Sequence, residues 1–410
     1  MIILLLGSLL FTGCGEAETV EVDTGVLHLA LRDGIYADVV EACLPAFEEA
    51  YSVTCEVTRF SEEDLHNTVL GKGTDGISYD VVMVDGSWTA ELTEQGMLAN
   101  LSELGCVLDN DIIPATTRIS YYNESIYLMP FYGNVTVLLY NKKLMEQYCY
   151  DPNRALSLRD LLSIAEKAKV GGKNGFLYRG DTPNNLVVDF LPILLSHGGW
   201  VVDQNNQPLI DTQVFRDAMS YYLRLIRSGK AMEKASLIES IDSGESCMAV
   251  AWPGWYTPTA DTAADYSALS GKLEPNSVAY NANVYGIWML GVSESSSNQK
   301  MAAALVSHLM DKDVQRSTIE IGGVPCRYSS LQDPDVLAVY PQYDAVAKAL
   351  QGGTYRPVMK DWTTFYTILG TEMDAIIKGE KEMDQGIKDA QVHLEQALNS
   401  GTNEFLDRRE

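Results

Sequence analysis

The chain has 410 residues, of which 46% are hydrophobic and 21% are charged, and its formal net charge is −26. This length exceeds one hydrophobic core of ordinary size and predicts two domains. A surface this acidic repels nucleic acid and anionic lipid, so no nucleic-acid partner is expected.

The chain begins with an uncharged apolar run, MIILLLGSLLFTG, which ends in small residues before Cys14. A membrane-spanning helix needs about 20 apolar residues, so this shorter run predicts a signal peptide at residues 1–13. The string LFTGC resembles the lipobox of bacterial lipoproteins, with Phe11 at the position where leucine is usual. This resemblance implies that Cys14 carries lipid and that the acidic stretch 14–25 is a solvated tether. We therefore expect the protein outside the cytoplasm, anchored to the outer face of the cell membrane.

Six cysteines follow Cys14, and their number permits disulfides in an exported protein without fixing a pairing. They are Cys43, Cys55, Cys106, Cys149, Cys247 and Cys326. None belongs to a CxxC pair and no histidine lies at a close ligand spacing from one, so neither a zinc site nor another metal site is expected. No cofactor is expected either.

Strands and helices alternate in the first part of the chain. The predicted strands are 26–32, 53–60 and 79–85, and the predicted helices are 35–51, about 62–71 and a helix that ends at Gly96. Ser61 and Asp64 form a capping pair at the start of the second helix. This β-α-β-α-β series predicts a parallel sheet with helices on both faces, and hence the α/β fold class.

The rest of the chain keeps a mixed pattern. Two β-rich runs flank Gly133 in 122–144, and a helix begins after Ser157. Further strands are predicted at 175–179, 246–252 and 283–293. Further helices are predicted from Pro183 to HGGW and at about 214–229, 297–310, 335–350, 363–378 and 384–399.

Five stretches occur in one order: YDVVMVDGSWTAELTEQGMLANL, LMPFYGNVTVLLYNKKL, LLSHGGWVVDQNNQPLID, SGESCMAVAWPGW and GEKEMDQGIKDAQVHLEQAL. Together they resemble the extracellular solute-binding proteins of family 1, which serve ABC importers of sugars, and are most similar to trehalose, maltose and oligosaccharide-binding members. The resemblance implies a periplasmic-binding-protein-like type II fold, in which two α/β lobes joined by a hinge close over a sugar in the cleft. It places lobe one at 26–138 plus 286–327 and lobe two at 139–285 plus 328–410. It also implies an ABC permease as the partner and a protein that acts as a monomer.

A sugar ring needs flat aromatic surfaces for its C–H face and polar groups for its hydroxyls. Asp85 and Trp88 follow a strand directly, and Trp255 follows the Pro-Gly turn of MAVAWPGWYTPTAD. The resemblance implies that these three side chains face the ligand. The competing interpretations are a helix cap for Asp85 and core packing for the two tryptophans.

Other candidates rest on their places near strand ends or on the resemblance. Asn134 stands where some maltose-type relatives carry an acid, and Arg356 matches an Arg-Pro of trehalose-type members, although an ion pair would also explain Arg356. Trp288 and Tyr285 lie where the chain returns to lobe one, where core packing is the alternative. The remaining candidates are Asp181, Asn185 and Trp252, with Asp33 and Glu62 as weaker ones.

Two other functions compete with sugar binding. The sequence contains no G-x-S-x-G, H-E-x-x-H or G-x-x-x-x-G-K-[ST] motif, and its five histidines are scattered, so an enzyme is not expected. A glycan-acting enzyme with two carboxylates across a cleft remains the less favoured reading. The same fold with a polyamine, peptide or other small solute is the main alternative, since cations also bind well on aromatic faces.

Overall fold

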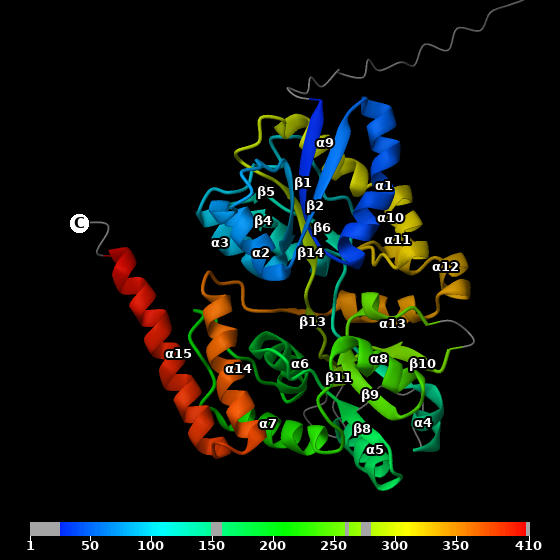
Figure 1. Ribbon diagram of the computed structural model, residues 1–410, viewed down its shortest axis with the longest axis vertical. Coiled ribbons are helices and arrows are strands. Elements are labelled where there is room, and N and C mark those ends of the chain that lie inside the picture. Colours follow the sequence, from blue (N-terminus) through cyan, green and yellow to red (C-terminus); the bar gives the residue numbers. More distant parts are fainter. Residues whose placement is uncertain (1–24, 149–157, 259–261, 272–279, 407–410) are drawn as a thin grey trace, which may run out of the picture.

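The computed structural model describes residues 25–148, 158–258, 262–271 and 280–406 (Figure 1). The predicted signal peptide, Cys14 and Cys149 lie outside the described residues. Two sheets, one in each half of the molecule, organise the fold, and a narrow junction connects them. The predicted two-lobed α/β fold is therefore confirmed.

The first sheet has five strands in the order β2-β1-β3-β14-β6. Their bounds are β1 Val26–Arg32, β2 Thr54–Phe60, β3 Val81–Asp85, β6 Met129–Tyr132 and β14 Trp288–Val292. β1 pairs in parallel with β2 and β3, as predicted, but β14 is antiparallel to both β3 and β6. The sequence set no direction for β14, which runs against the others because the chain re-enters this lobe from the junction, so this strand starts where the others end.

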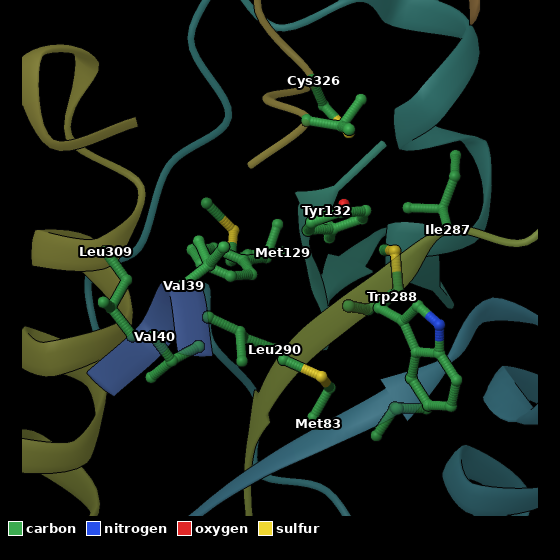
Figure 2. Packing of buried hydrophobic residues seen from close by; sticks show 14 of the residues in the cluster. Val39, Val40, Met83, Met129, Tyr132, Ile287, Trp288, Leu290, Leu309 and Cys326 are labelled. Atoms are coloured by element: carbon green, nitrogen blue, oxygen red, sulfur yellow. The ribbon is translucent and has the colours of Figure 1, made fainter. Parts of the chain in front are cut away.

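Helices cover this sheet and meet in a common core (Figure 2). Val39 and Val40 of α1 contribute to it from one side, and Met83 and Leu290 from the central strands. The predicted cap of α2 is confirmed, because Ser61 Oγ accepts a 3.1 Å hydrogen bond from the Asp64 amide. The helices of this half are α1 Ile35–Tyr51, α2 Glu62–Asn67, α3 Thr89–Glu94, α9 Gln299–Leu309 and α10 Lys312–Ser317.

The second sheet has four strands in the order β10-β7-β9-β8. Their bounds are β7 Val137–Asn141, β8 Asn174–Leu177, β9 Ser246–Ala251 and β10 Ala264–Ser267. Only the β8–β9 pair is parallel. The helices around it are α4 Lys142–Gln147, α5 Leu158–Val170, α6 Pro183–Ser196, α7 Gln213–Ile226, α8 Lys234–Asp242, α14 Trp362–Lys378 and α15 Met383–Leu406.

The junction contains a short parallel pair, β13 Val284–Tyr285 with β15 Thr354–Tyr355. Near it lie α11 Tyr328–Leu331, α12 Pro334–Val339 and α13 Gln342–Gln351 (Figure 1). Buried side chains of these three helices belong to the core of the first sheet, whereas those of α14 and α15 belong to the second core. The first core also takes in Leu139 and Ala251, so it continues across the junction. The lobe boundaries given above stay a prediction.

Short elements complete the described chain. They are the strands β4 Tyr121–Tyr122, β5 Ser125–Ile126, β11 Ser270–Gly271 and β12 Tyr280–Asn281, and the helical turns Thr68–Lys72, Gly86–Trp88, Pro114–Ser120, Pro253–Trp255 and Thr318–Ile321. The five described cysteines are free thiols, so the disulfides that the cysteine count permits do not form among them. Within the described ranges, no helix has the length and apolarity to cross a membrane, and no group of side chains is arranged to hold a metal ion.

Candidate functional site

A cavity of about 280 Å³ lies between the two sheets. From the first sheet, its walls come from the ends of β1 and β3, from the segments that follow β1, β2 and β6, and from the first residue of β14. Because β14 runs against the other four strands, its beginning lies at the same sheet edge as their ends. From the second sheet, the walls come from segments after β8 and β9. The cavity therefore lies where the strands of an open α/β sheet end, which is the usual place for a ligand in such folds.

Eight of the ten predicted contact residues line this cavity. Asp85, Asn134, Trp288 and Arg356 line it from the first lobe and the junction, and Asp181, Asn185, Trp252 and Trp255 line it from the second lobe. The two weaker candidates, Asp33 and Glu62, line it as well. The structure brings these residues together across more than 300 positions of the chain, and their roles in binding stay predictions.

The other two predicted residues lie outside the cavity wall. Trp88 is 6% exposed and stacks on His66 with ring centroids 4.5 Å apart, while its indole meets Trp288 edge to face at 5.7 Å. Trp88 thus supports Trp288 from behind, because the turn after β3 directs this side chain into the core. Tyr285 is 2% exposed, packs against Tyr355 and donates its hydroxyl to the Leu350 carbonyl. Trp88 and Tyr285 both pack in the core, as the competing interpretation proposed.

Asp85 and Arg356 form a buried ion pair at the cavity wall. Arg356 Nη2 donates to Asp85 Oδ1 at 2.7 Å, and its Nε donates to the Tyr285 carbonyl at 3.2 Å. Burial disfavours the charged guanidinium, but the Asp85 and Glu62 carboxylates outweigh burial and raise the pKa of Arg356. Asp85 also caps the turn after β3 by accepting from the Ser87 amide at 2.9 Å. The competing interpretations were a cap for Asp85 and an ion pair for Arg356. Both interactions are present, and both residues also line the cavity.

The tryptophans differ in how much surface they present. Trp252 and Trp288 are 7% and 3% exposed, so each presents only a small part of its ring to the cavity. Trp255, in the turn Pro253–Trp255 after β9, is half-buried. The Arg179 guanidinium carbon lies 4.9 Å from the Trp255 ring centroid and Lys234 Nζ lies 5.7 Å from it. Trp255 is thus an aromatic surface with two cations beside it, a geometry that favours electrostatic attraction to the ring.

Arg179 belongs to a second buried ion pair, which the sequence reasoning missed. Its guanidinium donates to Asp189, and its backbone amide donates to Asp189 Oδ2 at 3.0 Å. Arg179 Nη1 also donates to Asn185 Oδ1 at 2.6 Å, and the Asn185 amide donates to Asp181 at 3.0 Å. The two predicted residues Asp181 and Asn185 are therefore held in place by a cation that follows β8.

Further cavity residues were not predicted. Arg32 precedes the candidate Asp33 and Asn184 precedes the candidate Asn185, so the strand-end argument extended to neighbouring positions would have included both. Tyr36 lies three positions after Asp33, in the first turn of α1. Lys234 is the first residue of α8, and no feature of the sequence marks it. Burial raises the pKa of Tyr36 to about 12, so its phenol is a neutral hydrogen-bonding group.

Two buried acceptors in the cavity wall lack partners among the described residues. They are Oδ1 of Asn134, a residue 4% exposed, and Oδ1 of Asn184. A buried acceptor without a hydrogen bond costs about 1–3 kcal/mol. Glu62 also faces the cavity, and burial, together with the nearby Asp85 carboxylate, raises the pKa of Glu62. The wall therefore offers acceptors to a ligand that brings hydroxyl or amine donors.

Solved structures of solute-binding proteins share this fold. Maltose-bound MalE3 of T. maritima is 22% identical and superposes with a TM-score of 0.76, covering 91% of this chain and 99% of that one. A solute-binding protein of Agrobacterium radiobacter K84 in complex with ribitol is 20% identical with a TM-score of 0.76, covering 91% and 98%. The sugar-binding protein MalE of Xanthomonas citri is 17% identical with a TM-score of 0.76, covering 94% and 100%. At these identities the likeness establishes the type II fold.

Sequence comparison gives the family. A probable amino-acid ABC transporter periplasmic-binding protein of Sinorhizobium fredii is 23% identical over 85% of this chain and 84% of the relative. A probable ABC transporter-binding protein of Deinococcus radiodurans is 23% identical over 70% and 71%. The family model for the bacterial extracellular solute-binding protein matches residues 42–349, well over half of the chain. The chain therefore belongs to the bacterial extracellular solute-binding proteins, a family that acts outside the cytoplasm.

Proposed function

We propose that this protein captures a sugar or short oligosaccharide in the cavity between its lobes and delivers it to the permease of an ABC importer. The observation that carries the proposal is the combination of a half-buried indole, Trp255, with buried acceptors lacking partners, Asn134 and Asn184. A sugar supplies both counterparts, because its C–H face packs on an aromatic ring and its hydroxyls donate to such acceptors. The volume of about 280 Å³ is at the small end of ligand pockets and favours a short saccharide.

Capture proceeds by closure of the lobes in this proposal. A ligand shifts the equilibrium towards the closed form only by contacts that exist when both lobes meet. Gly254 in the second lobe lies against Tyr132 and Ile35 of the first, where even a Cβ atom would clash with the Tyr132 hydroxyl. The Pro-Gly turn that carries Trp255 therefore forms a contact between the lobes beside the cavity. In this proposal the ligand is bound and released without chemical conversion.

A second candidate is an amino acid or peptide. One relative carries the name of an amino-acid transporter component, and the cavity presents both carboxylates and cations. A polyamine fits less well beside Arg32 and Lys234, which line the cavity, form no ion pair with a described carboxylate and repel a cationic ligand there.

A thermal-shift screen of the full-length chain against saccharides, amino acids, peptides and polyamines tests these assignments. A ligand that binds the folded state raises the melting temperature by mass action. A shift with saccharides supports the proposal, and chromatography of the recovered sugar should show it unchanged. A shift confined to amino acids, peptides or polyamines would replace the sugar by that class.

We also propose that the protein acts as a monomer tethered through lipid on Cys14. The apolar run before Cys14 and the acidic stretch after it support this proposal. Expression with a radiolabelled fatty acid should label the wild-type chain and leave a Cys14→Ala variant unlabelled. Light scattering should give the mass of one chain, and a larger mass would contradict the monomer.

A further inference from the structure

Two of the four cations in the cavity wall form no ion pair with a carboxylate of the described residues. Arg356 is neutralised by Asp85 and Arg179 by Asp189. Lys234, in contrast, has no hydrogen bond or ion pair to any residue that the structure describes, and its ammonium lies near the Trp255 ring. Within the described part of the chain, Arg32 Nη1 donates to the carbonyls of Asp33 and Phe60 alone, at 3.2 and 3.3 Å, and its buried Nε has no partner.

These two cations lie in a positive part of the cavity. The charges that act on Lys234 are those of Arg32 and Arg179, and burial together with these two positive neighbours lowers the pKa of Lys234. None of the described acids of the cavity forms an ion pair with Lys234 or Arg32. Asp181 accepts from Asn185, and Asp33 lies 3.5 Å from Arg59. Burial and then the Asp85 carboxylate raise the pKa of Glu62, and Arg356, Arg32 and Arg179 act in the opposite direction, so this one carboxylate is shared among three cations and forms no ion pair with Lys234. Lys234 is exposed and Arg32 is half-buried, so water weakens their mutual repulsion without removing it. A bound anion lowers the free energy of this positive region.

The start of α1 adds to this positive region. Residues 32–36 line the cavity without interruption, and α1 begins there with Gly34 as its N-cap and no side-chain cap. The first amides of a helix have no partner within the helix, and the aligned peptide dipoles place partial positive charge at that end. Gly34 has a φ of 90°, a conformation that favours glycine, so the loop that presents these amides depends on this residue. Arg32 lies at the same place and contributes a full charge.

We propose that Arg32, Lys234 and the first turn of α1 form a subsite for an anionic group of the ligand, so that the preferred ligand is an acidic saccharide. This inference rests on the proposed sugar-binding function. The sugar ring packs beside Trp255, and its carboxylate or phosphate accepts hydrogen bonds from the Lys234 ammonium, the Arg32 guanidinium and the α1 amides. The anion then supplies the negative charge that the protein does not place at Lys234.

Matched pairs of acidic and neutral sugars test the subsite in calorimetric titrations of the full-length chain. Maltobionate against maltose, and galacturonate against galactose, probe a carboxylate. Trehalose 6-phosphate against trehalose probes a phosphate. We expect the acidic member of at least one pair to bind about tenfold or more tightly, because hydrogen bonds between charged groups are the strong ones. The pair that discriminates identifies the anion, and its affinity should fall as salt is raised.

Lys234→Met separates charge from packing, since methionine keeps an apolar chain beside Trp255. This variant should lose most of the preference for the acidic sugar over its neutral counterpart. Lys300→Met, an exposed position on α9 outside the cavity, changes the net charge equally and should leave the preference intact. Arg32→Gln is a second variant with the same expected loss of preference. It ranks after Lys234→Met because it also removes two hydrogen bonds to loop carbonyls.

The outcomes separate this inference from the proposed function. Neutral sugars that bind as tightly as their acidic partners would overturn the anionic subsite and leave the sugar receptor standing. A preference that survives in Lys234→Met and Arg32→Gln would also overturn it. Binding of amino acids alone, lost in Lys234→Met, would support the anion subsite and overturn the saccharide. No binding by any sugar or amino acid would overturn both.

Discussion

Two buried ion pairs flank the cavity, and they differ in what they connect. Asp85 and Arg356 join the end of β3 to the segment after β15, 271 positions apart in the chain. Arg179 and Asp189 lie 10 positions apart, in the segment after β8 and in α6. The first pair therefore connects a lobe to the junction, whereas the second fixes one side chain within a lobe. In both pairs a carboxylate neutralises most of the arginine charge, so little net charge faces the ligand.

This difference in connectivity determines which pair responds to movement of the lobes. A pair within one lobe moves as a unit, so it holds Arg179 over Trp255 in any arrangement of the lobes. A pair that spans lobe and junction depends on how β13 and β15 lie against β3. We therefore expect disruption of the first pair to alter both stability and closure, and disruption of the second to alter stability and the local surface alone.

Asp85→Ala should have the largest effect. It leaves the Arg356 charge buried and unpaired and removes the acceptor of the Ser87 amide, and breaking a buried ion pair costs about 3–5 kcal/mol. Denaturant unfolding should show this loss, with weaker ligand binding. The double variant Asp85→Ala with Arg356→Met should recover part of the stability, because no buried charge remains. A double variant less stable than Asp85→Ala would contradict the unpaired-charge explanation.

Asp189→Ala tests the local pair in the same way. Asp189 is 1% exposed and does not line the cavity, so we expect a similar loss of about 3–5 kcal/mol from the unpaired Arg179. The control is Asp344→Ala, which removes the exposed partner of Lys348 and should cost less than about 1 kcal/mol. Small-angle scattering should show the same ligand-induced compaction as wild type under native conditions. Loss of compaction would show that this pair also controls closure.

Gly254→Ala probes the contact between the lobes. A Cβ at this position would meet the Tyr132 hydroxyl and lie 3.3 Å from the Ile35 side chain. We expect a cost of about 1–3 kcal/mol to the form in which the lobes are in contact, as for overpacked cores. It should appear as weaker ligand binding. Tyr132→Phe, which removes the hydroxyl and its 2.9 Å bond to the Gly322 carbonyl, should relieve the defect in the double variant. If the losses of the two single variants simply added in the double variant, the Tyr132 hydroxyl would not be the atom that the new methyl group meets.

Trp255→Ala tests the aromatic surface beside the second ion pair. Removal of a central aromatic contact costs about 2 kcal/mol of binding free energy, roughly thirtyfold in affinity. Stability should change little because the side chain is half-buried and lies at the cavity. Trp200→Ala, another half-buried indole of the same lobe that does not line the cavity, is the matched control and should bind normally. If Trp255→Ala bound the ligand as tightly as Trp200→Ala, Trp255 would have no role in binding.

The sequence predicted the fold and much of the cavity wall for a physical reason. Residues after parallel strands meet at one edge, so Asp85 and Asp33 could be placed together without coordinates. The direction of each side chain could not be predicted. Trp88 and Trp288 are both aromatic residues at strand ends, yet one supports the other from behind. Arg179 and Lys234 were missed because their importance comes from packing on Trp255 across the fold, which no local pattern records.

Glu62→Gln should have the smallest effect, and it concerns the first ion pair. The pKa of Glu62 is raised mainly by burial and then by the Asp85 carboxylate, so ionised Glu62 destabilises the folded state relative to the unfolded chain. The folded state then binds this proton more tightly, and stability falls as pH rises from the ordinary carboxyl pKa through the raised one. Glutamine cannot ionise, so the variant should be more stable than wild type at every pH above the raised pKa of Glu62. At still higher pH the stability difference between the two proteins should stay constant. Unfolding free energies measured from pH 4 to pH 9 check this sign. A variant that loses stability at pH 8 would show that Arg32 and Arg356 stabilise the Glu62 carboxylate more than burial and Asp85 oppose it.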